Sequence, residues 1–359
     1  MGSLGIIANP MSGRDSRRLT ARAESVSHES KRNQISRIVV GAVATGCTRI
    51  LAPYDTRRLV LGALENMNIG AEVEEIKCPV THSAEDTRQA VREMKKRGCD
   101  VIIVMGGDGT SRIVTQVWQD VVMMPLSTGT NNVFPQWIEP TIAGMAAGLV
   151  ASGKLPKEET TDRAKLISVA LENGEKDIAL VDALFLQGDR IGNLGPFEPE
   201  FMKTLVLTRA EPNAVGMSPL GGLLCPASAS DDFGVRVDFC GHNEGGRLLR
   251  APVSPGLFRS AHILSAERLP LDEGTAIHGP GIIAYDGDRE RKLAAGESAT
   301  ITVERNGPWV INPQRTLQLA AERQLMADLP PWVDPFDGAI GGGCCGCANN
   351  LGHLIAPDD

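Results

Sequence analysis

The five residues Gly106-Gly107-Asp108-Gly109-Thr110 have the composition best suited to chemistry on a phosphate. They follow an apolar run and precede a segment with helical periodicity, which indicates a strand-to-helix turn. Glycines there allow positive φ angles and close approach of the backbone to a ligand, and the helix offers unpaired N–H groups to an anion. We expect Thr110 or Ser111 to cap this helix. Asp108 then lies where a carboxylate suits binding of Mg²⁺ or acceptance of a proton from an attacking hydroxyl.

A turn of this composition also occurs without a ligand, with its aspartate only capping the helix. Three further polar loops favour the functional interpretation. Residues 9–14 (Asn-Pro-Met-Ser-Gly-Arg) and 125–132 (Pro-Leu-Ser-Thr-Gly-Thr-Asn-Asn) follow expected strands, and residues 286–289 (Asp-Gly-Asp-Arg) follow a later one. Loops after parallel strands gather at the carboxyl edge of the sheet. We therefore expect the first two loops to converge with residues 106–110 on one cleft, which the last loop can close.

The elements that must position these loops are visible in the first half of the chain. Short apolar runs predict strands at 4–8, 49–52, 72–76, 100–105 and 121–126. Amphipathic segments predict helices at 31–45, 56–67, 83–97, 111–119 and 138–152. The run at 100–105 is rich in Val and Ile, as is typical of a strand buried on both faces. This alternation predicts a parallel α/β sheet with right-handed crossovers.

From about residue 165 the pattern changes to period-two strands separated by Gly and Pro turns. The expected strands are 166–171, 177–186, 204–208, 235–239, 281–285 and 299–303. Asn173-Gly174 between two such runs is a strong hairpin signal. The second half is therefore expected to be all-β. We expect a linker in the charged run 154–163 and a late helix at 315–326, and we find no periodicity from residue 329 onward.

Composition narrows the class of protein. The chain has 359 residues, 42% hydrophobic and 22% charged, which predicts a globular protein of two domains. A net charge of −8 and a pI near 5.4 speak against a nucleic-acid partner. No run reaches the ~18 apolar residues of a membrane span, and no secretory signal is evident, so we expect a cytoplasmic protein without a membrane partner. The six dispersed histidines disfavour a zinc site.

In this order and spacing, the segments NPMSG, GGDGT, PLSTGTNN and AYDGD resemble the NAD-kinase, diacylglycerol-kinase and sphingosine-kinase superfamily. The opening residues 9–19 and the segment 208–212 most resemble the acetoin-catabolism protein X family, which is NAD-kinase-like. The resemblance implies a Rossmann-like nucleotide-phosphate-binding domain at 1–155 and a β-rich, β-sandwich-like acceptor domain at 156–312. A helix at 313–328 would pack back on the first domain, before a Gly- and Cys-rich tail at 329–359. Such proteins often form homo-oligomers, dimers or tetramers.

The resemblance also implies ATP or polyphosphate as phosphoryl donor, Mg²⁺, and a set of site residues. Asp108 and Asp286 take the catalytic and metal-binding positions. The nucleotide-binding positions are Asn9, Ser12, Gly13, Arg14, Gly106, Gly107, Gly109, Thr110, Thr128, Gly129, Thr130 and Asn131. The Asn-Glu pair of true NAD kinases has no clean copy, and Asp182 is the nearest candidate.

Further residues suggest an acceptor pocket in the second half. The segments 208–212 and 216–222 are polar and Gly-rich, so they either line that pocket or form a surface loop. The candidate acceptor-binding residues are Asn132, Asp182, Arg209, Glu211, Ser218 and Asp288. The crowded thiols Cys344, Cys345 and Cys347 suit a soft metal or a redox pair, but an incidental cluster in a tail is the preferred interpretation.

These features together predict an ATP-dependent kinase that phosphorylates a hydroxyl of a small soluble metabolite, NAD(H) or a related polyol-like acceptor. A non-catalytic nucleotide-binding regulator with the same fold is the alternative. A lipid kinase is disfavoured because the chain is acidic and shows no basic amphipathic helix.

Overall fold

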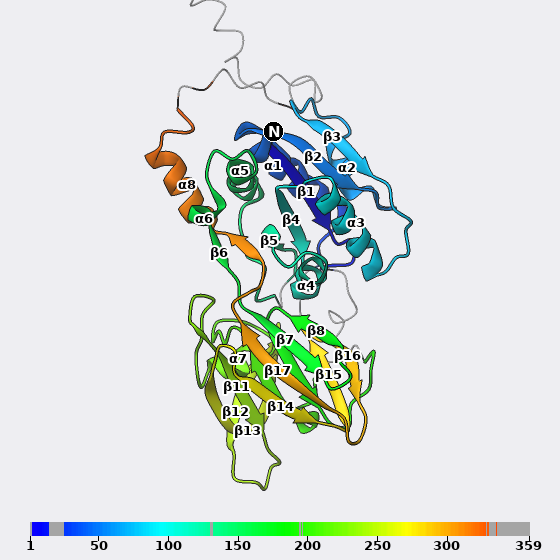
Figure 1. The fold of residues 1–359 in the computed structure, drawn as a ribbon, viewed down its shortest axis with the longest axis vertical. Coiled ribbons are helices and arrows are strands. Elements are labelled where there is room, and N and C mark those ends of the chain that lie inside the picture. Colours follow the sequence, from blue (N-terminus) through cyan, green and yellow to red (C-terminus); the bar gives the residue numbers. More distant parts are fainter. Residues whose placement is uncertain are drawn as a thin grey trace, which may run out of the picture.

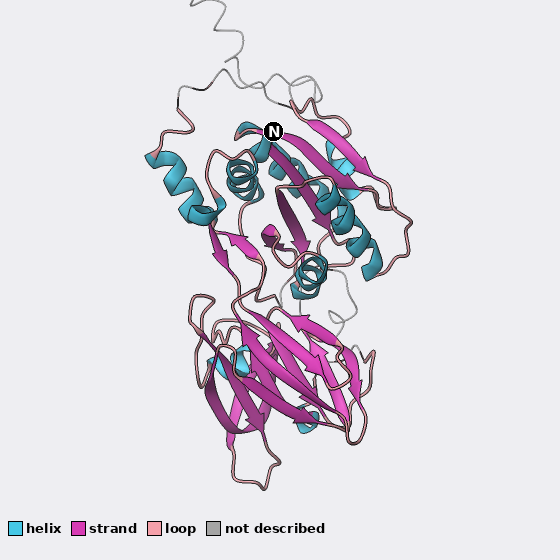
Figure 2. Ribbon diagram, viewed as in Figure 1, coloured by secondary structure: helices cyan, strands magenta, loops and turns pink. Residues whose placement is uncertain are grey.

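The computed structural model describes residues 2–13, 25–129, 132–193, 195, 197–327, 329 and 335. An α/β unit that contains the N-terminus lies above a β unit in Figure 1. Helices surround the upper sheet, whereas strands dominate the lower unit (Figure 2). The cysteine cluster of the tail lies outside the described residues.

The α/β unit is built on a seven-stranded sheet with the order β3-β2-β1-β4-β5-β18-β6. Neighbouring strands run parallel from β3 to β18, and β6 is antiparallel to β18. The predicted parallel α/β sheet is confirmed. Its strands are β1 (Gly2–Ala8), β2 (Cys47–Pro53), β3 (Glu72–Ile76), β4 (Val101–Gly106), β5 (Val122–Ser127), β6 (Thr161–Arg163) and β18 (Trp309–Ile311).

Helices cover both faces of this sheet, because the strands bury apolar side chains on both sides. Helices α1, α2 and α5 pack on one face, and α3 and α4 pack on the other. Helix α3 begins after Ser83, whose side chain accepts a hydrogen bond from the amide of Glu85, as expected for an N-cap. The helices are α1 (His28–Ala44), α2 (Leu59–Leu64), α3 (Ala84–Lys96), α4 (Asp108–Val117), α5 (Pro140–Ala151), α6 (Lys157–Thr160), α7 (Ser218–Gly222), α8 (Pro313–Glu322) and the 3₁₀ helix η2 (Pro199–Phe201).

The two connections between the units contain short strands that the sequence did not indicate. The segment 154–163, expected as a linker, contains α6 and the strand β6. Strand β18 returns from the β unit and inserts between β5 and β6. Both strands have only three residues, too few to show a periodic pattern. The first sheet is therefore completed by residues from both ends of the β unit.

The β unit consists of a seven-stranded sheet with the order β12-β13-β11-β10-β9-β15-β16 and a four-stranded sheet with the order β14-β17-β7-β8. One apolar core joins the two sheets, which confirms the predicted β-rich, sandwich-like architecture. The strands are β7 (Leu166–Leu171), β8 (Lys176–Ala179), β9 (Asp182–Leu186), β10 (Met202–Leu207), β11 (Phe233–Phe239), β12 (Arg247–Ser254), β13 (Leu257–Pro270), β14 (Gly274–His278), β15 (Gly281–Tyr285), β16 (Asp288–Leu293) and β17 (Ser298–Glu304).

Two local features of the β unit matter for the site. The hairpin predicted at Asn173-Gly174 forms between β7 and β8, with Gly174 at φ 85°. The single strand expected over 177–186 is broken at Leu180 and Val181, so that β8 and β9 belong to different sheets. This break brings three consecutive backbone N–H groups to the boundary with α4, directly above β8 in Figure 1.

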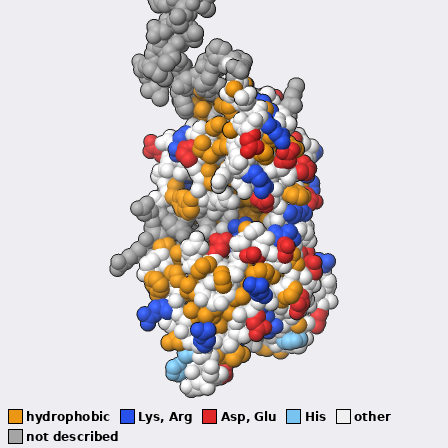
Figure 3. Space-filling model, turned by 90° about the vertical axis from the view of Figure 1, so that its left-hand side faces the viewer, with side chains coloured by type: hydrophobic (Ala, Val, Ile, Leu, Met, Phe, Trp, Pro, Cys, Tyr) orange, Lys and Arg blue, Asp and Glu red, His pale blue; other side chains and the backbone are white. Residues whose placement is uncertain are grey.

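The outer surface is mixed in character. Figure 3 shows one side of the molecule, where hydrophobic side chains are scattered over both units and basic side chains lie among acidic ones along one flank. Among the described helices, none combines the length and apolarity needed to cross a bilayer.

Helices α1 and α5 approach each other closely through glycines. A Cβ atom added to Gly144 would lie 2.0 Å from the carbonyl oxygen of Ile38, and one added to Gly41 would lie 2.3 Å from that of Thr141. These distances are far shorter than any real Cβ contact, so each glycine is required by the backbone of the facing helix.

We predict that Gly144→Ala lowers the free energy of unfolding by about 1–3 kcal/mol, because the added methyl group overpacks this contact. Urea unfolding followed by circular dichroism measures the change. Gly70→Ala, where no atom lies within 4 Å of the added Cβ, is the matched control and should stay within about 0.5 kcal/mol of the wild type. Equal stabilities of the two variants would contradict the close contact.

Candidate active site

The predicted phosphate turn lies where β4 ends and α4 begins. Helix α4 starts at Asp108, and Gly107 is its N-cap without a side-chain cap bond. The expectation that Thr110 or Ser111 caps the helix is therefore wrong, because both lie within the first turn. Asp108 is the first helical residue, a position where the helix dipole favours a negative charge.

The glycines of this turn serve close packing, not unusual backbone angles. Contrary to expectation, Gly106, Gly107 and Gly109 have no positive φ. A Cβ on Gly106 would lie 2.6 Å from the side chain of Thr110, and one on Gly107 would lie 2.8 Å from Oδ1 of Asn132. A Cβ on Gly109 would lie 3.3 Å from Oδ2 of Asp288. The turn is thus lined by polar side chains from two other loops at very short range.

Asp108 is buried against the loop that follows β5. Its Oδ1 accepts hydrogen bonds from the amides of Val133 (3.1 Å) and Phe134 (2.8 Å). Burial and then the charge of Asp286 raise the pKa of Asp108, these amides and Arg209 lower it, and the net result is a pKa of about 7. A carboxyl that titrates near neutrality is well matched to accepting a proton from a hydroxyl.

Asp286, the second predicted catalytic residue, is bonded to the break between β8 and β9. Its carboxylate accepts hydrogen bonds from the amides of Leu180 (2.9 Å), Val181 (2.8 Å) and Asp182 (3.2 Å). Its own amide donates to the carbonyl of Asp182 at 3.0 Å, and its φ is 47°. Burial raises its pKa, against the effect of Arg112 and the amides. The geometry gives Asp286 a positioning role for the turn that carries Asp182.

Asp182 is the least satisfied carboxyl of the group. Its side chain is buried, and its Oδ1 has no hydrogen-bond partner among the described residues. Burial raises its pKa well above the ordinary value, and the negative charges of Asp286 and Asp108 add to this effect. The raised pKa favours the neutral form of this carboxyl, whose buried Oδ1 is left without a hydrogen-bond partner among the described residues.

Arg112 is a site residue that the sequence analysis missed. It is fully buried on α4, one turn after Asp108, and it faces the β15–β16 hairpin. Its guanidinium lies 3.7 Å from a carboxylate oxygen of Asp286, 3.7 Å from one of Asp288 and 2.5 Å from one of Glu290. The alternating acidic residues 286, 288 and 290 are the signal that could have indicated a basic partner.

The first loop is organised by a buried lysine, also missed. The Nζ of Lys31 donates to the carbonyls of Asn9 (2.7 Å), Pro10 (3.1 Å) and Ser12 (2.7 Å). The side chain of Asn9 in turn donates to Oγ1 of Thr110 at 2.9 Å. One lysine on α1 thus fixes the loop after β1 against the phosphate turn.

The loop after β5 meets the first loop from the other side. The hydroxyls of Ser12 and Thr128 lie 2.6 Å apart. Gly13 has a φ of 72°, and a Cβ there would lie 2.6 Å from the carbonyl oxygen of Thr128. The carbonyl of Gly129 accepts a hydrogen bond from Ser127. The predicted residues Arg14, Thr130 and Asn131 lie outside the described residues.

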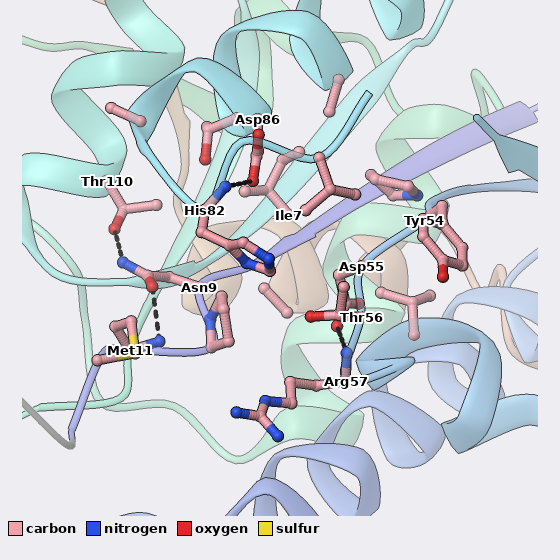
Figure 4. A pocket seen from close by; sticks show the side chains of 18 of the residues that line it. Ile7, Asn9, Met11, Tyr54, Asp55, Thr56, Arg57, His82, Asp86 and Thr110 are labelled. Atoms are coloured by element: carbon pink, nitrogen blue, oxygen red, sulfur yellow. Dashed lines mark hydrogen bonds between the residues drawn. The ribbon is translucent and has the colours of Figure 1, made fainter. Parts of the chain in front are cut away.

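A cavity of about 740 Å³ opens beside these loops, at the ends of β1 and β2 and the start of α3. Figure 4 shows Asn9 and Thr110 at one side of it, Tyr54 and Arg57 at the other, and the His82 side chain between them. The lining comes only from the α/β unit. Its size falls within the range of nucleotide- and drug-sized sites.

The candidate acceptor residues differ in what they contact. Arg209 donates to the carbonyl of Val133 at 3.3 Å, across the boundary between the units. The hydroxyl of Ser218 donates to the carbonyl of Arg209 at 2.9 Å and accepts from the amide of Glu211 at 2.8 Å, so it shapes this turn. The structure therefore brings Arg209 against the loop after β5 and uses the Ser218 side chain within its own loop.

The sequence predicts that Asp108 and Asp286 bind Mg²⁺, and the arrangement of the carboxylates shows how far they could do so. In the part of the chain that the structure describes, no three His, Cys, Asp or Glu side chains are placed to enclose an ion. Mg²⁺ commonly keeps several waters and takes one or two carboxylates together with substrate phosphates. An ion that arrives with a nucleotide would therefore take the ionised carboxylate of Asp108, and otherwise phosphate and water oxygens.

Comparison with known proteins identifies the fold. A family model described as the ATP-NAD kinase N-terminal domain matches residues 4–154. The crystal structure of yeast NADH kinase complexed with NADH superposes with a TM-score of 0.55, at 11% identity, over 93% of this chain and 90% of that one. The chain therefore has a NAD-kinase-like fold.

A second family model, described as the acetoin catabolism protein X C-terminal domain, matches residues 165–306. The chain is 32% identical over 339 residues to acetoin catabolism protein X of Cupriavidus necator, covering 91% of this chain and 94% of that protein. The chain belongs to the acetoin catabolism protein X family, as its motifs predicted.

We predict that Lys31→Met lowers the free energy of unfolding by about 2–4 kcal/mol, because the half-buried carbonyls of the first loop lose their charged donor. Urea unfolding measures the change. Lys96→Met, at a side chain that is 78% exposed, is the control and should have an effect below about 1 kcal/mol. A Lys31→Met variant as stable as the control would show that the loop does not depend on this ammonium group.

The pKa of Asp108 predicts a pH dependence of stability. In the unfolded chain this carboxyl titrates near 3.8, and in the folded protein near 7, so between these values only the folded state retains the proton. The stabilisation is complete below the unfolded pKa and is lost as the pH rises through 7. We expect the stability of Asp108→Asn relative to the wild type to increase by up to about 3 kcal/mol from pH 5 to pH 8. Asp120→Asn, at a side chain that is 75% exposed, should show no such trend.

Proposed function

We propose that the protein is an ATP-dependent kinase that transfers the terminal phosphoryl group to a hydroxyl of a small soluble metabolite. The observation that carries this proposal is the position of Asp108. Its carboxyl, with a pKa near neutrality, lies at the N-terminus of the helix whose Thr110 lines the cavity, within the electrostatic influence of Asp286 and Arg209 of the β unit. A nucleotide on one side and a hydroxyl compound on the other would meet at this residue.

The donor nucleotide would occupy the cavity of the α/β unit, with its phosphates directed to the phosphate turn. The cavity is lined by Asn9, and the same loop continues through Ser12 and Gly13. The loop after β5 meets it there, with Thr128 in contact with Ser12 and followed by Gly129. The unpaired amides at the start of α4 favour the negative charge of the phosphates. Bound Mg²⁺ would neutralise phosphate charge, which is its usual contribution to phosphoryl transfer.

Asp108 would act as the proton acceptor. The acceptor oxygen forms a bond to the terminal phosphorus, the bond from that phosphorus to the leaving ADP oxygen breaks, and the hydroxyl proton passes to the Asp108 carboxylate. Asp182 would accept or donate a hydrogen bond to the acceptor through its free Oδ1. Arg112 and Asp286 hold the opposing turns in place and touch neither substrate in this scheme.

NAD(H) is one acceptor to test, because yeast NADH kinase shares the fold. The residue before Asp182 is Val181, whereas true NAD kinases carry an asparagine before the acidic residue of their Asn-Glu pair. This apolar replacement removes a hydrogen-bonding group from the acceptor side and favours a metabolite other than a dinucleotide.

We predict that the wild type forms a phosphorylated product from a metabolite pool in the presence of ATP and Mg²⁺, detected by mass spectrometry. Asp108→Asn should reduce turnover by about 10²–10⁴-fold, because it removes the proton acceptor. Its folding is checked by circular dichroism, and Asp120→Asn should retain activity. Full turnover by a folded Asp108→Asn variant would contradict the assignment.

Filling the cavity tests the donor site separately. Thr87→Trp places a large ring among the lining residues and should abolish the rise in melting temperature that ATP causes. Gln187→Trp, in a second cavity of about 680 Å³ on the β unit, is the matched control and should leave ATP binding intact. ATP binding without any product from the wild type would instead support the nucleotide-binding regulator.

A further inference from the structure

Arg209 bridges the two units at the cleft. It follows β10 by two residues, and its side chain reaches the loop after β5, where Nη1 donates to the carbonyl of Val133 at 3.3 Å. The guanidinium lies 5.1 Å from the ring centroid of Phe134, which is buried. Packing on an aromatic face fixes the plane of a guanidinium and leaves its remaining N–H groups directed outward.

The same dipeptide holds the proposed proton acceptor. The amides of Val133 and Phe134 donate to the carboxylate of Asp108, while the carbonyl of Val133 accepts from Arg209. Two hydrogen bonds and one residue of backbone therefore separate the two side chains, which limits their distance to about 10 Å. Asp108 and Arg209 nevertheless form no ion pair within 4.0 Å among the described residues.

Among the described residues, Arg209 has no carboxylate in direct contact with its guanidinium, unlike the buried Arg112 and Arg289. Arg112 contacts three carboxylates, and Arg289 pairs with Asp189 at 2.5 Å. Among the described residues, Arg209 makes one hydrogen bond, to a neutral carbonyl, and no ion pair. Glu211 and Asp108 are close enough to stabilise its charge at a distance, yet burial still lowers its pKa. A half-buried guanidinium with free donors is a site for an anion.

We propose that the acceptor is a small hydroxyl compound that carries a carboxylate or phosphate group a few bonds away from the hydroxyl that is phosphorylated. Arg209 binds this anionic group, and the hydroxyl reaches Asp108 from the same side of the Val133–Phe134 dipeptide. The short span between the two side chains admits hydroxy acids or sugar phosphates and excludes neutral polyols as good acceptors. This inference rests on the proposed kinase function.

The test compares matched acceptors of equal chain length: glycerol, glycerate and glycerol 3-phosphate, then ribose, ribonate and ribose 5-phosphate. ADP release and product mass are measured for the wild type and for Arg209→Met. We expect charged acceptors to exceed the neutral ones in kcat/KM by about 10- to 100-fold, and Arg209→Met to remove this advantage mainly through KM. Arg209→Lys should recover part of it, more for phosphate than for carboxylate, because a lysine binds as a point charge.

Arg268→Met is the matched control, because Arg268 also stacks on a ring, that of Phe233 at 4.5 Å, but lies exposed on β13 away from the cleft. It should keep the preference for charged acceptors. A neutral acceptor used as well as its charged homologue, or an unchanged preference in folded Arg209→Met, would overturn the inference. A loss of ATP affinity in Arg209→Met with unchanged acceptor KM would also overturn it, since Arg209 would then serve the donor.

A binding measurement that does not require turnover tests this inference separately from the proposed function. If no acceptor is phosphorylated, the kinase proposal fails, but calorimetric titration of the wild type with glycerate and inorganic phosphate still tests Arg209. Anion binding that weakens at least tenfold in Arg209→Met, and not in Arg268→Met, supports the anion site. Anion binding that is absent from the wild type, or equal in both variants, contradicts it.

Discussion

Arg112 carries a positive charge from the second turn of α4 into a group of three carboxylates on the β15–β16 hairpin. Taking a guanidinium out of water costs several kcal/mol unless it is paired, so this cation is stable only while the hairpin lies against α4. The same contact places Asp288 over Gly109 and orients Asp286 toward the β8–β9 break. This ionic cluster, in which Arg112 and Asp286 are buried while Asp288 and Glu290 are partly exposed, therefore helps to hold the two units together.

The charge of Asp286, a member of this cluster, also affects the protonation of the other buried carboxyls of the site. Burial raises the pKa values of Asp108, Asp182 and Asp286, and the negative charge of Asp286 raises those of Asp108 and Asp182 as well. The ionised form of Asp182 is the least stabilised of the three carboxylates, because its Oδ1 has no partner among the described residues. Asp182 is therefore the carboxyl that most favours its protonated form. Asp108, bonded by two amides, titrates near neutrality and can alternate between its two states. Distinct surroundings thus give chemically identical side chains different tasks.

Much of this architecture could be predicted from the sequence, and the failures have physical causes. Strands such as β4 are apolar on both faces, and the polar turns after them lie at one edge of the sheet, so the first sheet and the position of Asp108 follow from pattern alone. Strands β6 and β18 were missed because three residues carry no period. Lys31 and Arg112 look like ordinary helix-surface residues until the tertiary fold buries them. For the three glycines of the phosphate turn, the sequence predicted both positive φ angles and close packing. Only the close packing is found, because their φ angles are negative or extended.

The two sides of the site differ in how much of the chain they require. The cavity beside Asn9 and Thr110 is lined by the α/β unit alone, so the proposed nucleotide would be bound there without any contribution from the β unit. In the proposed scheme the acceptor side uses Asp108 from one unit and Arg209 from the other, joined through Val133 and Phe134. A water molecule has no anionic group to engage Arg209, so it gains nothing from the second unit, whereas an anionic acceptor is held by both. Recognition through the shared dipeptide would therefore favour phosphoryl transfer to the acceptor over hydrolysis of the donor.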